Sequence, residues 1–157
     1  MVFTEAWRRK ISNQSPVPSP QSLILNPGAV TLAELRAVWA GTPVELHGEA
    51  WAAIDASAAS VSRILASGRT VYGVNTGFGL LAQTRIPDDR LAELQTNLIL
   101  SHSCGLGAPL SPRIVRLAMI LKAIGLGRGH SGVRRIVVER LLTLVEADAL
   151  PVIPGQG

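Results

Sequence analysis

The stretch Val71-Tyr72-Gly73-Val74-Asn75-Thr76-Gly77-Phe78-Gly79 combines three glycines with the single tyrosine of the chain. No charged residue occurs from Thr70 to Thr84, and the apolar residues there follow no regular period. Glycine permits backbone conformations that other residues avoid, so this composition is typical of a pliable loop. We therefore predict a loop that presents Tyr72.

Two helices are predicted to flank this loop. Before it, apolar residues recur at helical spacing over residues 49–67, and Gly68 is placed to end that helix as a C-cap. After it, Asp88-Asp89 lies where negative charge stabilises a helix N-terminus. Four residues of the second helix are expected along one face: Leu91, Leu94, Leu98 and His102. Gly105-Leu106-Gly107 is predicted to end this second helix, which places His102 near its C-terminus.

Further helices are predicted on both sides of this pair. Thr31-Leu32-Ala33-Glu34 is a capping box that opens a helix running to about Ala40. Ser111-Pro112 supplies an N-cap and a proline at the first helical position, and a very apolar helix follows. Apolar periodicity predicts a last helix over residues 133–147. The sequence is therefore that of a mainly α protein.

Two short apolar segments, Leu23–Leu25 and Val44–Leu46, are predicted to be strands that pair as a minor hairpin. Residues 1–21 include Ser15-Pro16-Val17-Pro18-Ser19-Pro20, a composition that forms no regular structure. We expect residues 1–21 to be a disordered extension and residues 22–157 to form the folded part. The predicted fold class is mainly α with a minor short β-hairpin.

Composition narrows the classes of function. Hydrophobic residues make up 47% of the chain without a run of about 18 uncharged apolar residues, which argues against a membrane span. The net charge of +4 is scattered and only 4% of residues are aromatic, which argues against nucleic-acid binding. One cysteine and an N-terminus without an apolar segment indicate a cytoplasmic protein. His47, His130 and Cys104 lack metal-ligand spacing, so no metal is expected.

Three segments together resemble the N-terminal part of the aromatic amino acid ammonia-lyases. They are the tyrosine loop, Asn97-Leu98-Ile99-Leu100-Ser101-His102-Ser103-Cys104-Gly105 and Arg128-Gly129-His130-Ser131-Gly132-Val133-Arg134-Arg135. The first two are long and occur at the separation found in that family. The resemblance covers about Leu23 to Gly157. It implies the helical fold of these lyases, which is fumarase/aspartase-like, and the non-oxidative elimination of ammonia from an aromatic L-amino acid.

The resemblance also implies roles for individual residues. Tyr72 matches the family tyrosine that is implicated in proton transfer at the β-carbon of the substrate. His102 matches a residue facing the aromatic part of the substrate, and the Ser101-His102 pair resembles the histidine-specific and tyrosine-specific branches. L-Histidine, converted to urocanate in histidine catabolism, is the expected substrate, with L-tyrosine left open. The expected substrate-binding residues are His102, Asn75, Gly79, Leu80 and Leu81.

The residues alone leave structural alternatives open for each of these positions. From the loop alone, the sequence favours a half-buried loop aromatic at Tyr72. His102 continues the apolar stripe of its predicted helix and is consistent with a core histidine. Asn75 is a residue type that tolerates tight turns, so it is consistent with shaping the loop. The family resemblance is what favours the functional reading of Tyr72 and His102.

In that family the electrophile is a methylidene-imidazolone, formed from an Ala-Ser-Gly tripeptide that lies just past the point matching Gly157. Ala66-Ser67-Gly68 spells the tripeptide but precedes the tyrosine loop, and we interpret it as a helix C-cap. We therefore expect no cofactor bound by this chain and no activity from the isolated 157-residue polypeptide. Family members are tetramers whose active sites draw on three subunits, so we expect a homo-oligomer or a complementing lyase chain as partner.

Two other functions remain open. The chain is consistent with a split subunit that joins a separate chain carrying the electrophile. It is also consistent with a non-catalytic helical module that binds or regulates lyase subunits. Activity that appears on mixing with a partner chain separates the first of these from the second.

Overall fold

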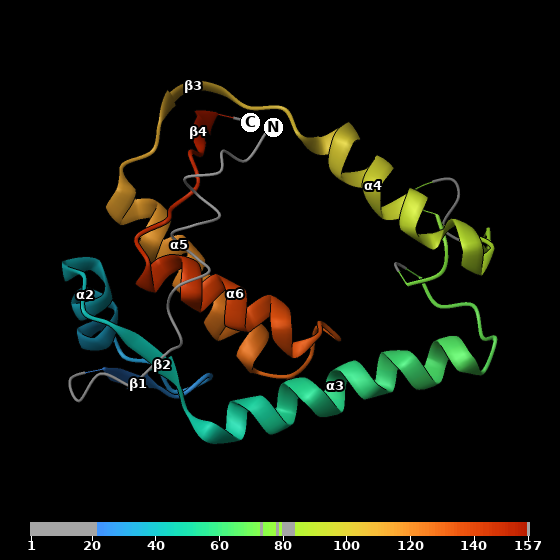
Figure 1. Ribbon diagram of the computed structural model, residues 1–157, viewed down its shortest axis with the longest axis horizontal. Helices are drawn as coiled ribbons and strands as arrows, with labels where there is room; N and C mark the ends of the chain where they lie inside the picture. Colours follow the sequence, from blue (N-terminus) through green and yellow to red (C-terminus); the bar gives the residue numbers. More distant parts are fainter. Residues whose placement is uncertain (1–21, 73, 78, 80–83, 157) are drawn as a thin grey trace. The chain divides into compact units, whose positions relative to one another are not determined.

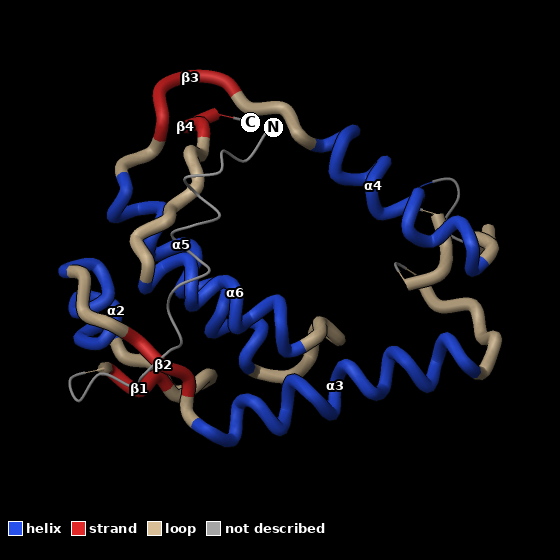
Figure 2. The backbone as a smooth tube through the Cα atoms, viewed as in Figure 1, coloured by secondary structure: helices blue, strands red, loops and turns tan. Residues whose placement is uncertain are grey.

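The computed structural model describes residues 22–72, 74–77, 79 and 84–156 (Figure 1). The predicted extension over residues 1–21 lies outside these residues. The chain forms two compact units, one built from the residues up to Ala58 together with Pro109–Ile153, the other from Ala59–Ala108 together with the C-terminal residues. Helices dominate both units and the strands are short, as the backbone tube shows (Figure 2), so the mainly α prediction is confirmed.

The first unit holds the apolar core. Its elements are β1 (Leu23–Leu25), α2 (Leu32–Ala40), β2 (Val44–Leu46), the start of α3 (Gly48–Ala66), α5 (Pro112–Gly127) and α6 (Arg135–Glu146). Helix α5 packs against α2 and α6. The buried apolar side chains come from all of these elements: Leu25, Val38, Leu46, Ala50, Ile54, Val115, Met119, Ile120, Ala123, Leu126, Val138 and Val145.

The predicted helix signals act as expected in α2. The Thr31 side chain accepts a hydrogen bond from the Glu34 amide at 3.3 Å, and the Glu34 carboxylate accepts one from the Thr31 amide at 2.6 Å. This capping box satisfies amides that the first turn leaves without a partner. The hydrogen bonds that the Glu34 carboxylate accepts from the Thr31 amide and from the Thr31 hydroxyl hold the pKa of Glu34 below its ordinary value. Gly41 ends the helix at φ 99°, a conformation that suits glycine.

The two N-terminal strands are present where predicted, but the expectation of a hairpin was wrong. β1 and β2 pair in parallel, with Leu23 opposite Val44 and Leu25 opposite Leu46. Helix α2 lies between them in the sequence and provides the crossover that a parallel pair requires. The capping box and the two strands were all visible in the sequence, and together they form a β-α-β unit.

A side chain of α5 joins the ends of two neighbouring helices. Arg116 Nη1 donates to the Val145 carbonyl at 2.9 Å, and Arg116 Nη2 donates to the carbonyls of Gly41 and Thr42 at 3.3 Å each. These carbonyls lie at the C-terminal ends of α6 and α2, where a cation also interacts favourably with the helix dipole. Arg116 Nε is buried without a hydrogen-bond partner among the described residues. One guanidinium therefore links α2, α5 and α6.

The start of α3 is held to the segment that leads into α6. A side chain at Gly129 (φ 72°) would place its Cβ 2.6 Å from the Ala53 carbonyl oxygen, so only glycine fits this approach. Arg135 forms an ion pair with Asp55 and lies 5.0 Å from the centroid of the Trp51 ring. These contacts hold the first turns of α3 within the first unit.

The second unit contains the end of α3, the short 3-10 turn η2 (Asp88–Arg90), helix α4 (Leu91–His102) and most of β3 (Leu106–Pro109), which pairs with β4 (Pro154–Gln156). Helix α4 ends at His102, a few residues before the Gly105-Leu106-Gly107 segment that was predicted to end it. The β3–β4 pair was not predicted, because its sequences consist largely of glycine and proline, which are rare in strands. A side chain at Gly105 would meet Pro154 at 2.5 Å, so the two segments approach closely.

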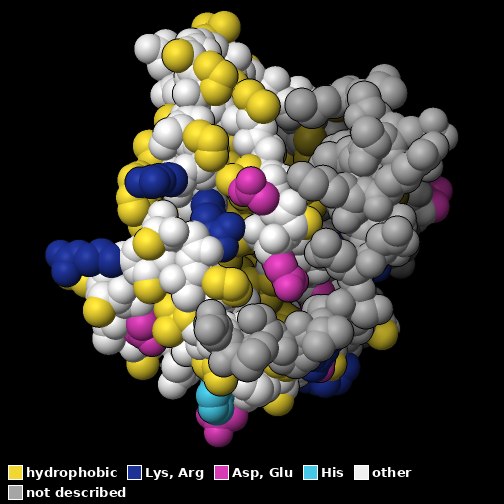
Figure 3. Space-filling view, turned by 60° about the vertical axis from the view of Figure 1, so that its left-hand side comes forward, with side chains coloured by type: hydrophobic (Ala, Val, Ile, Leu, Met, Phe, Trp, Pro, Cys, Tyr) yellow, Lys and Arg dark blue, Asp and Glu magenta, His cyan; other side chains and the backbone are white. Residues whose placement is uncertain are grey.

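Apolar side chains remain on the surface of the molecule. Ile24 and Leu32 are exposed in the first unit, and hydrophobic side chains are spread over the face drawn in Figure 3. Helix α4 has no buried residue at all, with Ile99 66% and Leu100 70% exposed. Within the described part of the chain, no helix is both long and apolar enough to cross a membrane.

Replacing Arg116 with methionine should lower the free energy of unfolding by about 1–3 kcal/mol, because carbonyls at the ends of α2 and α6 lose their donor. Arg113, exposed on the same helix, provides the matched control. Arg113→Met should change stability by less than about 0.5 kcal/mol. Urea unfolding measures the free energy of unfolding of both variants, and the comparison requires that the m-value stays unchanged. Equal effects of the two substitutions would show that the Arg116 contacts do not stabilise the unit.

The Asp55–Arg135 pair predicts a pH-dependent contribution to stability. The hydrogen bonds from Arg135 hold the pKa of Asp55 below its ordinary value, so the folded state favours the carboxylate. The resulting stability is present above the unfolded pKa of about 3.9 and is lost as pH falls through the lower folded pKa. Asp55→Asn should therefore be less stable than wild type at neutral pH, and this difference should shrink below about pH 4. Glu146→Gln, an exposed control, should show no such narrowing in thermal unfolding.

Candidate functional site

Tyr72 lies on a tight turn in the second unit. The amides of Val74 and Asn75 donate to the Val71 carbonyl at 3.1 and 3.2 Å, and this closes the turn around the tyrosine. The side chain of Tyr72 is 64% exposed. The predicted loop is therefore confirmed, and it presents the phenol at the surface of its unit.

Asn75 is wholly buried and its amide bonds to the backbone of the same loop. Asn75 Nδ2 donates to the Arg69 carbonyl at 2.8 Å, and Asn75 Oδ1 accepts from the Val71 amide at 2.8 Å. Both polar atoms of the side chain thus hold the turn that carries Tyr72. Asn75 therefore shapes the loop, which was one of the two roles considered from the sequence. Contact between Asn75 and a substrate stays a prediction.

The two ends of the loop are joined at its base. Thr76, also buried, forms an antiparallel bridge with Arg85, and the Gly77 amide donates to the Thr84 carbonyl at 3.2 Å. Arg85 Nη1 donates to the Gly68 carbonyl at 3.1 Å, which connects this base to the end of α3. Sequence reasoning missed Arg85, because an arginine that follows an uncharged loop gives no signal of its partner. Gly79 is exposed at φ 58°, whereas Leu80 and Leu81 lie outside the described residues.

The residues Ala66-Ser67-Gly68 end α3, as predicted. The amides of Ser67 and Gly68 donate to carbonyls of the preceding turn, those of Arg63 and Leu65, at 3.0 and 3.1 Å. The Ser67 hydroxyl donates to the Ile64 carbonyl at 2.7 Å, and Gly68 has φ 69°. This tripeptide is a hydrogen-bonded helix C-terminus. The interpretation as a C-cap is therefore confirmed.

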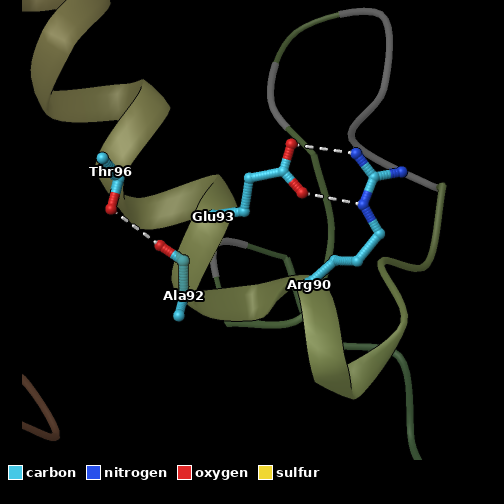
Figure 4. Close-up of polar contacts among 4 residues, drawn as sticks. All are labelled: Arg90, Ala92, Glu93 and Thr96. Atoms are coloured by element: carbon cyan, nitrogen blue, oxygen red, sulfur yellow. Dashed lines mark hydrogen bonds and ion pairs between the residues drawn. The ribbon is translucent and has the colours of Figure 1, made fainter.

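Helix α4 positions His102 at its last residue. At the start of this helix, Arg90 forms a bidentate ion pair with Glu93 through contacts of 2.9 and 3.0 Å (Figure 4). This pair holds the pKa of the Glu93 carboxyl below its ordinary value. The Thr96 hydroxyl donates to the Ala92 carbonyl at 3.0 Å, one turn before it. These two contacts lie on the first turns of α4, and the far end carries His102.

The His102 ring is exposed and one of its nitrogens faces the last turn of α4. Nδ1 lies 2.9 Å from the Leu98 carbonyl oxygen and 3.0 Å from Ser101 Oγ. Ser101 Oγ in turn donates to the Leu98 carbonyl at 3.1 Å. Leu91, Leu94 and Leu98 are half-buried, so the predicted stripe is present, but His102 is exposed and is not a core histidine.

The structure places Tyr72, Asn75, Gly79 and His102 in the same compact unit. Their roles toward a substrate stay predictions. Among the described residues, no group of three histidine, cysteine, aspartate or glutamate side chains could hold a metal ion. The chemistry that this arrangement offers is an exposed phenol on a closed loop and an exposed imidazole at a helix end.

Comparison with known proteins gives a consistent result. The sequence model described as "Aromatic amino acid lyase" matches residues 30–157. The chain is 56% identical over 137 residues to a histidine ammonia-lyase of Paracidovorax citrulli. The aligned segment covers 87% of this chain and 27% of the relative. The chain is 52% identical over 137 residues to a histidine ammonia-lyase of an Enterobacter strain, with the same coverage. The chain thus spans about a quarter of the length of these relatives.

Solved structures agree with these relatives. Histidine ammonia-lyase from Trypanosoma cruzi superposes with a TM-score of 0.76 at 40% identity, covering 85% of this chain and 26% of that one. Tyrosine aminomutase from Streptomyces globisporus superposes with a TM-score of 0.80 at 29% identity, covering 87% and 26%. With a family match that extends from residue 30 to residue 157, this chain belongs to the aromatic amino acid lyase family.

Proposed function

We propose that this chain forms the tyrosine-loop part of a histidine ammonia-lyase, which converts L-histidine to urocanate and ammonia. The observation that carries the proposal is the 56% identity to a histidine ammonia-lyase over a segment that includes both candidate side chains. The closed loop around Tyr72 and the exposed ring of His102 support it. L-Tyrosine is the second candidate substrate, favoured by the 29% identity to a tyrosine aminomutase.

In this proposal the two side chains act at different ends of the substrate. Tyr72 removes a proton from the β-carbon, while the bond between the α-carbon and the amino nitrogen breaks and a carbon–carbon double bond forms. His102 binds the aromatic ring and holds it in place. Gly79, Leu80 and Leu81 are proposed to line the ring pocket. Because Tyr72 is 64% exposed here, further groups must pack over the phenol before it is desolvated.

The described residues do not fit the electrophile of this family. Forming a methylidene-imidazolone from Ala-Ser-Gly requires the glycine nitrogen to attack the alanine carbonyl carbon. Ala66-Ser67-Gly68 holds its amides in helix-terminal hydrogen bonds to Arg63 and Leu65, so it is not arranged for this ring closure. We therefore assign this chain binding and proton transfer only, and infer that the electrophile comes from other residues of the assembled enzyme.

Assembly is the second part of the proposal. Helix α4 has no buried side chain, and Ile99, Leu100 and Leu106 are each at least 66% exposed. Apolar surface on this scale favours association, since burial of such side chains contributes about 25 cal/mol per Å². We propose that α4 packs against further lyase segments, in a homo-oligomer or with a complementing chain. The single cysteine supports a cytoplasmic location.

A chimeric lyase tests the proposed function directly. In it, this chain replaces the matching segment of the Paracidovorax citrulli relative. The chimeric lyase should produce urocanate from L-histidine, measured by ultraviolet absorbance, and Tyr72→Phe should lower kcat by about 10²–10⁴-fold. Trp39→Phe, a conservative change in the first unit, should leave kcat within about twofold. The 157-residue polypeptide alone should yield no urocanate.

An assembled chimeric lyase that is inactive on L-histidine would contradict the proposal. Light scattering establishes the assembly, so that failure to associate is not mistaken for failure of catalysis. Activity on L-tyrosine in place of L-histidine would favour the second candidate. Full activity of Tyr72→Phe would remove Tyr72 from the proton transfer.

Asn75 provides a separate prediction about the loop. Asn75→Ala removes both side-chain hydrogen bonds, those to the Arg69 carbonyl and the Val71 amide, so the free energy of unfolding should fall by about 1–3 kcal/mol. In the chimeric lyase kcat should fall as well, because the phenol is no longer held. Asn97→Ala, an exposed asparagine on α4, is the matched control and should change stability by less than about 0.5 kcal/mol. Equal effects of the two variants, measured by urea unfolding, would exclude a special role for Asn75.

A further inference from the structure

The Leu98 carbonyl determines which nitrogen of His102 carries the proton. A carbonyl oxygen only accepts hydrogen bonds, and it lies 2.9 Å from His102 Nδ1. Nδ1 must therefore be the protonated nitrogen and the donor, since two facing lone pairs at this distance would repel. In the neutral ring, Nε2 then has a free lone pair. We propose that His102 is held as the Nδ1–H tautomer and offers Nε2 as a hydrogen-bond acceptor to the substrate ring.

Ser101 supports the same tautomer. Its hydroxyl oxygen lies 3.1 Å from the Leu98 carbonyl and 3.0 Å from His102 Nδ1. A hydroxyl has one proton, and the carbonyl can only accept it, so the Ser101 proton points to Leu98. The hydroxyl oxygen then has lone pairs left to accept part of the Nδ1–H bond. Ser101 is thus a positioning residue, which acts on the substrate through His102.

The other side of the ring is available. Within the described part of the chain, Nε2 of His102 makes no hydrogen bond, and the side chain is exposed. An acceptor without a partner is costly once a substrate covers it, whereas a donor on the substrate removes that cost. The site therefore favours rings that carry an N–H or O–H group, such as imidazole or phenol. A phenyl ring offers no such donor and leaves Nε2 unpaired.

The preference for a ring donor rests on the proposed function, whereas the tautomer does not. For L-histidine, it follows that the protonated nitrogen of the substrate ring faces Nε2 of His102. The other ring nitrogen of the substrate is then left as an acceptor for a different group. This fixes both the tautomer and the orientation of the bound substrate.

Nitrogen NMR tests the tautomer without any catalysis. The chain contains three histidines, so ¹⁵N-histidine labelling gives a small set of signals. The set that disappears in His102→Asn belongs to His102. At about pH 8.5, two units above the ordinary imidazole pKa, two-bond ¹H–¹⁵N spectra should show a protonated Nδ1 and a bare Nε2. A majority of the Nε2–H tautomer would overturn the proposal.

Ser101 variants of the chimeric lyase provide the second test. Ser101→Ala should lower the preference for L-histidine over L-phenylalanine, measured as the ratio of kcat/KM values, by about fivefold, the equivalent of one net hydrogen bond. Ser101→Thr keeps the hydroxyl and should restore the preference. Ser103→Ala is the matched control, because the Ser103 hydroxyl donates to the Ile99 carbonyl at 2.5 Å and not to the Leu98 carbonyl that orients the ring. It should leave the preference unchanged.

The outcomes separate this inference from the proposed function. An unchanged preference in Ser101→Ala, or an equal loss in Ser103→Ala, would overturn the positioning role. Urocanate formation together with an Nε2–H tautomer would show that the enzyme acts as proposed and that the inference is wrong. An Nδ1–H tautomer in this chain, together with an assembled chimeric lyase that makes no urocanate, would confirm the tautomer and contradict the function.

Discussion

Backbone carbonyls and amides at the ends of helices and in tight turns need hydrogen-bond partners, and much of this structure depends on how side chains supply them. Arg116 donates to carbonyls at the ends of α2 and α6. In the second unit, the Asn75 side chain satisfies two backbone groups that precede Tyr72, the Arg69 carbonyl and the Val71 amide. The same rule joins His102 to the Leu98 carbonyl. Packing and site geometry therefore rest on one constraint, which acts at short range and through few side chains.

Local signals in the sequence predicted the helices well. The capping box at Thr31, the proline after Ser111 and Gly68 at the end of α3 act within a single turn, so no distant residue is needed to interpret them. Strand pairing is a different problem. β1 and β2 were located correctly, but their parallel arrangement depends on α2 packing as a crossover. The β3–β4 pair joins segments far apart in the sequence and is made of residues that disfavour strands, so propensity gave no indication of it.

In the candidate site too, features set by local sequence were predicted, whereas contacts with other residues were not. The loop around Tyr72 and the helix that carries His102 followed from glycine content and apolar spacing. The partners that hold these side chains did not, since Arg85 and Ser101 act through contacts that only coordinates provide. Asn75 shows the limit of residue-type arguments, because an asparagine in a turn is equally consistent with binding substrate and with closing the loop. Its side-chain amide is buried and forms two hydrogen bonds to the backbone, which explains how Asn75 holds the loop.

The absence of buried side chains in α4 has a dynamic consequence. A helix that is held by backbone hydrogen bonds and little packing opens locally at low free-energy cost, and its amides exchange with solvent early. The Leu98 carbonyl orients His102 only while the last turn of α4 is formed, so the ordered imidazole exists in proportion to the folded fraction of that helix. Any surface that covers Ile99 and Leu100 raises this fraction. In the proposed function, association would then strengthen substrate binding without contacting the substrate, because it increases the population of the competent state.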